Sequence, residues 1–340
     1  MNEKEILSTV LKVVDQKCST PTCLDDRKEY NQVVYFAQKN GLYYKFVTGV
    51  TSGSSQIHNL DTEQWTITSE RIGDCKQTIE FLDGVCNRYG IDFVLIKLFN
   101  TIQHVPNDID IFVNRNDRKR LIHALEENGM EPLYSSVTET KLEGDYVKTD
   151  IYTQVRHLGM DFLDDDLVWS SKTQNEFFGV EYPALNSNAD LLMLIPHHIL
   201  VHKRMTLLDF LHLRNRIREA DTAWCRDYAY ERGWGRLFDL MLDHVSSLEQ
   251  KIYEENEYVE FPYVFDTRFV LRCISESNGP NVNYYNKPFL YMSFYLQDLM
   301  YRTEGTYPYR FLRSVPLARR TVNSISSLLK VLRGDRKSSN

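Results

Sequence analysis

Apolar residues recur at helical spacing through the first fifty residues of the chain. The pattern covers Glu3–Val14 and residues 27–47, where Val33, Val34 and Ala37 belong to one predicted helix. Residues 51–65 are rich in Ser, Thr and Gly and predict a loop. We therefore expect an N-terminal helical cap over residues 1–70.

The central part of the chain mixes helical and strand patterns. One helix is predicted to end at Gly90, and another spans about residues 117–128. Strands are predicted over residues 92–96, 109–113, 130–135 and 146–155. This order predicts an α+β unit over residues 71–186, in which helices cover a small mixed sheet.

From Ser187 onward the pattern changes to helices. Ser187 and Asp190 match the Ser-x-x-acid capping arrangement, which favours a helix start. Helices are predicted over residues 187–204 with a kink at Pro196, over residues 206–219, and after Asp221 and Trp234. We expect a C-terminal helical domain over residues 187–310. The last segment, residues 311–340, interleaves basic and apolar positions and predicts an amphipathic tail that docks on a partner or an anionic surface.

Composition excludes several classes of protein. With 42% hydrophobic and 26% charged residues among 340, the chain is too apolar to be disordered. A formal net charge of -7 argues against coating nucleic acid through bulk charge. The sequence shows no signal peptide and no apolar run of the about 20 residues that a membrane helix needs, so we expect a cytoplasmic location. The six cysteines include no CxxC pair and are expected to be reduced. Cys18 and Cys23 could form half a zinc site, but no second pair follows at a usual spacing.

Three aspartates are the main candidates for chemistry. Asp108 and Asp110 lie at alternate positions of a predicted strand, so their side chains leave the same face about 7 Å apart at the backbone. Asp150 occupies a later strand and can reach that face from a neighbouring position. Three carboxylates on one face repel one another unless cations lie between them, and Mg²⁺ (or Mn²⁺) prefers oxygen ligands. Asp161 competes with Asp150 as the third acid, and an isolated Asp-x-Asp can simply end a loop.

At these residues the chain resembles the polymerase-beta-type nucleotidyltransferase superfamily, and more closely an uncharacterised prokaryotic branch with helices on both sides of the catalytic domain. The resemblance implies a nucleotidyltransferase-like fold in which Asp108, Asp110 and Asp150 are both the metal ligands and the catalytic residues. It covers roughly residues 25 to 245, in order. The matching segments are residues 30–41, 93–97, 108–113 and 150–152, with Asn188, His198, His202 and Leu208-Asp209 in the helical half.

One position departs from the family pattern. Leu98 stands where the family has a glycine that lets the backbone approach the triphosphate, so its side chain is expected to obstruct phosphate. Lys97, Asn100 and Thr101 remain as candidate nucleotide-binding residues. His198 and His202 share a helix face at i, i+4, but the zincin motif requires Glu after the first histidine and Ile199 occupies that position. We expect packed helix histidines that border the active-site cleft.

The resemblance implies a metal-dependent transferase. It would move a nucleoside monophosphate from a nucleoside triphosphate to a hydroxyl of an unknown acceptor, which is a small molecule, a protein or an RNA. Two metal ions would be held by the three aspartates. Because of Leu98, a catalytically degenerate protein that only binds a nucleotide, sugar or partner stays open as an alternative. So does a component of a toxin-antitoxin pair, on fold analogy alone.

Overall fold

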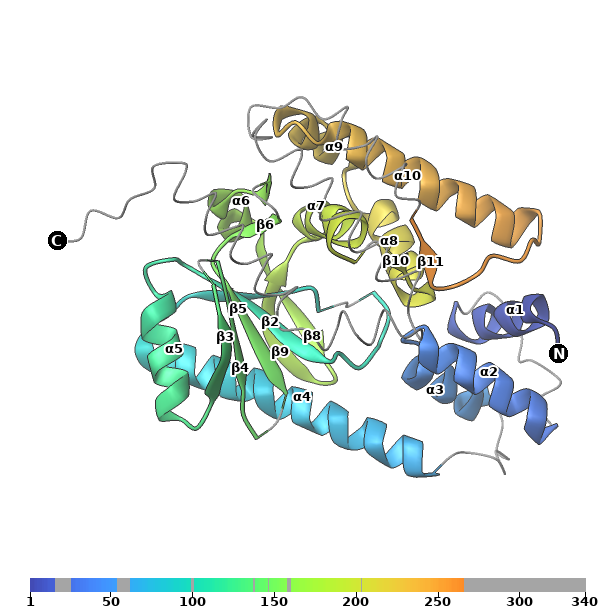
Figure 1. The fold of residues 1–340 in the computed structure, drawn as a ribbon, viewed down its shortest axis with the longest axis horizontal. Coiled ribbons are helices and arrows are strands. Elements are labelled where there is room, and N and C mark those ends of the chain that lie inside the picture. Colours follow the sequence, from blue (N-terminus) through green and yellow to red (C-terminus); the bar gives the residue numbers. More distant parts are fainter. Residues whose placement is uncertain are drawn as a thin grey trace, which may run out of the picture. The chain divides into compact units, whose positions relative to one another are not determined.

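A seven-stranded mixed sheet forms the centre of the computed structural model (Figure 1). The structure describes residues 1–15, 26–53, 62–98, 101–136, 138–145, 147–157, 160–202 and 204–265. The strand order is β3-β4-β5-β2-β1-β9-β8, in which β2 pairs with β5 and β1 pairs with β9 in parallel. The other pairings in this sheet are antiparallel. The strands are β1 Phe93–Ile96, β2 Asp108–Val113, β3 Glu131–Ser135, β4 Glu139–Glu143, β5 Lys148–Tyr152, β8 Lys172–Phe177 and β9 Val180–Leu185.

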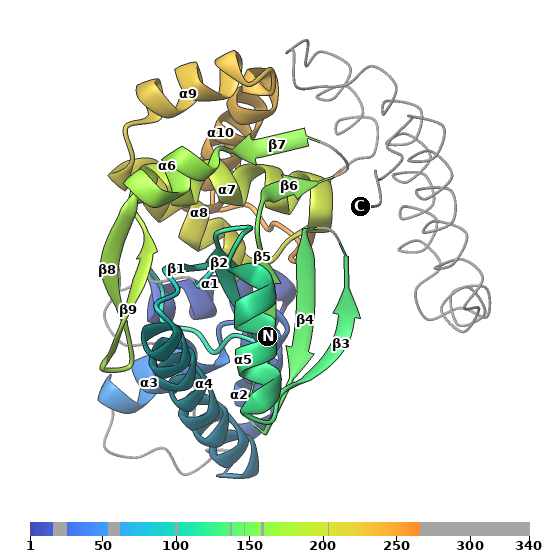
Figure 2. The same ribbon diagram turned by 90° about the vertical axis from the view of Figure 1, so that its left-hand side faces the viewer.

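Two helices cover one face of the sheet. The long helix α4, Thr62–Tyr89, and α5, Arg118–Glu127, pack against each other and against this face (Figure 2). Ile109 and Ile111 of β2 are buried among their apolar side chains. Since side chains alternate along a strand, Asp108 and Asp110 lie on the opposite face, where Phe112 contacts Trp169 of α6, Asp165–Ser170.

The N-terminal helices pack against one another, and the second of them contacts the C-terminal helices. They are α1 Glu3–Val14, α2 Arg27–Lys39 and α3 Tyr43–Gly53. The helical pattern over residues 27–47 is divided between α2 and α3, because Gly41 adopts φ +74 and α2 ends before it at Asn40. The fully buried Asn40 side chain accepts a hydrogen bond from the Leu207 amide at 3.1 Å, at the start of α8. Asn40 therefore joins α2 to the C-terminal helices.

The second half of the described chain is mostly helical, as predicted. Its elements are α7 Ser187–Pro196, the π-helix η1 His197–His202, α8 Leu207–Glu219, α9 Thr222–Glu231, α10 Gly235–Glu249 and the π-helix η2 Gln250–Glu254. Two two-stranded sheets, β6 Val155–His157 with β7 Met160–Leu163 and β10 Arg204–Met205 with β11 Tyr263–Val264, accompany these helices. The predicted kink at Pro196 takes the form of the π-helical turn that follows it. The N-cap of α7 is Asn186 rather than Ser187, because the Asn186 side chain accepts from the Ala189 amide, while Asp190 pairs with Arg216.

The α+β class predicted from the sequence is confirmed, with helical regions on both sides of a mixed sheet. The strand predicted over residues 146–155 is in fact divided between β5 and β6, which belong to different sheets. Helix α4 continues through residue 70. Residues 1–283 form one compact unit, so the predicted boundaries at 70 and 186 both fall inside it. The predicted basic tail, and the pair Cys18 and Cys23, lie outside the described residues. No helix in the described part of the chain is long and apolar enough to span a membrane.

Candidate active site

A row of charged side chains crosses four neighbouring strands of the sheet. Asp150 of β5 is paired in register with Asp110 of β2 on one side and with Lys141 of β4 on the other. Asp110 is in turn opposite Ile96 of β1, the residue before Lys97. Neighbouring strands are about 4.8 Å apart, so the row holds two acids side by side with a lysine at each end.

Asp110 is the acid nearest the β1 end of the row. Its side chain is only 10% exposed, and its Oδ1 accepts a hydrogen bond from Lys97 Nζ at 3.1 Å. Burial raises the pKa of Asp110 to about 6, the Lys97 charge opposes that rise, and the charges of Asp108 and Asp150 add to it. The three aspartates are therefore close enough to repel one another.

Asp150 is buried at the centre of the row. Lys141 donates a hydrogen bond to its Oδ2, and Lys141 also contacts Glu139 Oε1 at 3.2 Å. Burial raises the pKa of Asp150, Lys141 lowers it, and the charges of Asp108 and Glu139 raise it again. Asp108 is half-buried at the start of β2, and no hydrogen bond from another described residue reaches its carboxylate. Each acid thus has a different electrostatic setting.

Lys97 turns the chain directly after β1. Its backbone is in the left-handed region, φ +60, and its ammonium group also lies 4.1 Å from the centre of the Tyr152 ring. The Leu98 side chain is partly buried and packs against the apolar core, to which α4, α5 and the strands contribute. This packing gives Leu98 a role in the apolar core, while its effect on phosphate stays a prediction.

Of the other two nucleotide-binding candidates, only Thr101 is among the described residues. Asn100 lies outside the described residues. The Thr101 hydroxyl is 2.5 Å from Nδ1 of His212 on α8, and His212 Nε2 is 3.5 Å from Asp190. No contact found among the described residues links Thr101 to the three aspartates, so a role for Thr101 at the nucleotide is an untested prediction.

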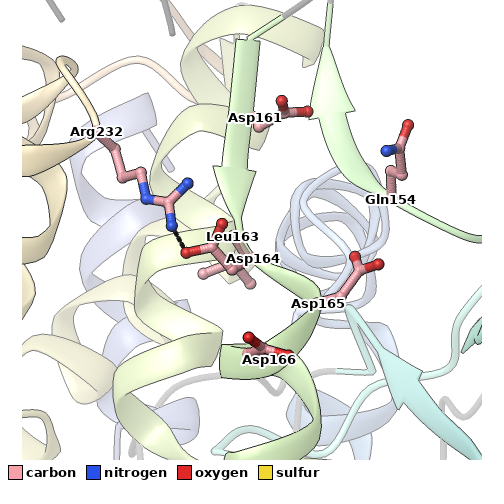
Figure 3. Close-up of a pocket in the computed structure, with 7 residues that line it drawn as sticks. All are labelled: Gln154, Asp161, Leu163, Asp164, Asp165, Asp166 and Arg232. Carbon is pink, nitrogen blue, oxygen red and sulfur yellow. Dashed lines mark ion pairs between the residues drawn. The ribbon is translucent and has the colours of Figure 1, made fainter. Parts of the chain in front are cut away.

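Asp161, the competing third acid, lies elsewhere. It belongs to β7 and forms an ion pair with Arg156 at 3.1 Å. With Asp164, Asp165, Asp166 and Arg232, it lines a separate cavity of about 430 Å³ (Figure 3). The strand register therefore places Asp150, rather than Asp161, beside Asp110.

One histidine of η1, His202, is within electrostatic reach of Lys97. Desolvation is the largest cause that lowers the pKa of His202 to about 4, and the charges of His198 and Lys97 act in the same direction. His198 is buried, and its pKa is also lowered by burial. Within the described ranges, no three His, Cys, Asp or Glu side chains are arranged as a ready set of metal ligands.

The donor chemistry of the row nevertheless fits a hard divalent cation. The three aspartates offer only carboxylate oxygens, which Mg²⁺ and Mn²⁺ prefer. Asp110 gives only Oδ1 to Lys97 and Asp150 gives only Oδ2 to Lys141, so each keeps one oxygen outside these pairs. A cation at Asp108 and Asp110 would relieve the repulsion that raises the pKa of Asp110.

Sequence reasoning missed Glu139 and Lys141, because no strand was predicted over residues 137–145. A signal was present: Glu139, Lys141 and Glu143 alternate with Thr140 and Leu142, as in a strand with one buried face. The three charged residues in this five-residue segment made the alternation of buried and exposed positions hard to recognise.

No family model matches the chain, and no curated protein matches it. Among solved structures, a lincomycin-bound lincosamide antibiotic adenylyltransferase, LnuA, is similar over 42% of this chain and 97% of its own, with 15% identity and a TM-score of 0.33. The antibiotic-resistance factor ANT(2'')-Ia is similar over 56% of this chain and 97% of its own, with 12% identity and a TM-score of 0.33. An antigenic nucleotidyltransferase-like protein from Paracoccidioides brasiliensis covers 58% of this chain and 96% of its own, with 10% identity and a TM-score of 0.36. Likenesses at these scores carry no weight for the function of this chain.

Proposed function

We propose that this chain is a metal-dependent nucleotidyltransferase, which moves a nucleoside monophosphate from a nucleoside triphosphate to a hydroxyl of an acceptor molecule. The observation that carries the proposal is the register of Asp110 with Asp150, which brings two buried acids together beside Asp108 and within reach of Lys97. Three carboxylates gathered on one sheet face are costly for stability, and a site that binds cations accounts for them.

The residues of the row have different roles in the proposed transfer. Asp108 and Asp110 would hold Mg²⁺ or Mn²⁺, which would supply charge stabilisation at the phosphate oxygens. Lys97 donates to a phosphate oxygen of the triphosphate, while the Tyr152 ring keeps its ammonium group in place.

Asp150 accepts the proton of the acceptor hydroxyl. The hydroxyl oxygen forms a bond to the α-phosphorus, the bond from that phosphorus to the oxygen bridging towards the β-phosphorus breaks, and pyrophosphate leaves. Positioning and electrostatics supply most of the rate enhancement in such a displacement.

The test is transfer of label from α-³²P nucleoside triphosphates, with Mg²⁺ or Mn²⁺ and cell extract as the source of acceptor. We expect labelled product with the wild type and with Asp161→Ala, which removes an acid from the separate cavity. The double variant Asp108→Ala/Asp110→Ala should lose at least about 100-fold in rate. Transfer that persists unchanged in the double variant would refute the assignment.

A protein that binds nucleotide without transferring it is the second candidate. It is favoured by the two lysines, since Lys97 and Lys141 already neutralise Asp110 and Asp150 in the absence of a metal. Metal-dependent binding of a non-hydrolysable triphosphate without turnover of any natural triphosphate would support this candidate, and turnover would exclude it.

A further inference from the structure

Lys141 contacts two carboxylates among the described residues, whereas Lys97 contacts one. Lys141 lies within a strand whose backbone pairs with β3 on one side and β5 on the other, and its ammonium group contacts both Asp150 and Glu139. Glu139 also accepts a hydrogen bond from the Tyr152 hydroxyl at 3.3 Å, which fixes the carboxylate that holds Lys141. Lys97 has a single carboxylate partner and follows the last residue of β1.

Lys141 already contacts one oxygen of the acid that a second metal ion would require. In a site with two divalent ions, the third acid contributes to the ion on the acceptor side. Here the third acid already accepts a hydrogen bond from an ammonium group, and a divalent ion beside that ammonium would meet a like charge at short range.

We propose that Lys141 takes the place of the second divalent cation, so that the site binds one ion, at Asp108 and Asp110, while Lys141 serves as the permanent counter-ion of Asp150. This inference rests on the proposed function, because it presumes a metal at the aspartates. Lys141 is a positioning residue in this account, since it acts by holding Asp150.

Mn²⁺ binding provides a test that does not depend on activity. Free Mn²⁺ is counted by electron paramagnetic resonance during titration of the full chain with Mn²⁺ alone. We expect one tightly bound Mn²⁺ ion for the wild type and two for Lys141→Met. The second site of the variant should bind Mn²⁺ at least about tenfold more tightly than any second site of the wild type. The matched control is Lys172→Met, which removes a lysine paired with Asp92 at the opposite edge of the sheet and should leave the single ion unchanged. Adding Asp150→Asn to Lys141→Met should abolish the second ion.

The outcomes separate this inference from the proposed function. Two ions of similar affinity in the wild type, or one ion in a folded Lys141→Met variant, would overturn the role of Lys141 and leave the transferase proposal standing. No bound ion in the wild type at millimolar Mn²⁺, or one that persists in Asp108→Ala/Asp110→Ala, would overturn both. Circular dichroism and the melting temperature confirm that each variant is folded, and Lys141→Arg, which keeps the positive charge, should restore the single-ion behaviour if Lys141→Met alters it.

Discussion

An obstructing role and a packing role for the Leu98 side chain predict different effects when that side chain is shortened. If it merely obstructs phosphate, shortening it should improve activity. In the structure its side chain packs, partly buried, against the apolar core shared by α4 and the sheet. Leu98→Ala should therefore destabilise the protein without improving transfer.

The magnitude follows from the extent of burial. A fully buried leucine loses roughly 2.7–5 kcal/mol on truncation to alanine, and Leu98 is only partly buried, so about 1–2.5 kcal/mol is expected. In a chain of this size each kcal/mol lowers the melting temperature by about 2 °C, which gives a fall of about 2–5 °C. Leu98→Gly should cost about 0.5–1 kcal/mol more, because Leu98 is not among the residues with positive φ and glycine only adds freedom to the unfolded chain.

Thermal unfolding and the label-transfer assay together decide the matter. Leu133→Ala, at a position that is 52% exposed on β3, is the control and should change stability by less than about 0.5 kcal/mol. A rise in transfer of about tenfold in Leu98→Gly would show that the side chain obstructs phosphate. An unchanged melting temperature in Leu98→Ala would show that it has no packing role.

Three further predictions concern stability. Asn40→Ala should lower the free energy of unfolding by about 1–3 kcal/mol, because the Leu207 amide loses its buried acceptor. An unchanged midpoint of unfolding in denaturant would contradict this. Arg214→Met should lower the free energy of unfolding by about 3–5 kcal/mol, since it leaves Asp15 without the guanidinium that contacts both its oxygens. If the two residues are coupled, the double variant Asp15→Asn/Arg214→Met should lose less stability than the sum of the two single variants. Burial lowers the pKa of His244 from 6.5 to about 4, so the unfolded chain binds a proton first as the pH falls. The melting temperature should drop between pH 6.5 and 4, by the equivalent of about 1–3 kcal/mol, and less steeply in His244→Phe.

The carboxylate face was predictable because it depends on local pattern. Alternation along residues 108–113 separates the two aspartates from Ile109 and Ile111, and the same alternation places Asp150 with Tyr152. The order of predicted elements then limited which strands could be neighbours. The register of Asp110 with Asp150 required the structure, since a shift of one residue would have separated them.

The lysines were less predictable for a physical reason. Lys97 adopts φ +60 without being glycine or asparagine, and its ion pair with Asp110 and its contact with the Tyr152 ring compensate for that conformation. These partners come from two other strands, so nothing next to Lys97 in the sequence indicates them. Lys141 is similar, because its pairing with Asp150 depends on the β4–β5 register rather than on neighbouring residues.

The charge of the row supports a site built for a single divalent ion. Asp108, Asp110, Asp150 and Glu139 supply four carboxylates, whereas Lys97 and Lys141 supply two ammonium groups. Without a bound nucleotide the row therefore carries two more negative than positive charges, which one divalent cation would balance. If neither lysine were present, the same carboxylates would favour two such cations. The two lysines at the ends of the row therefore set how many metal ions the aspartates can hold, and Asp108, which has no lysine partner among the described residues, is where the single ion should first bind.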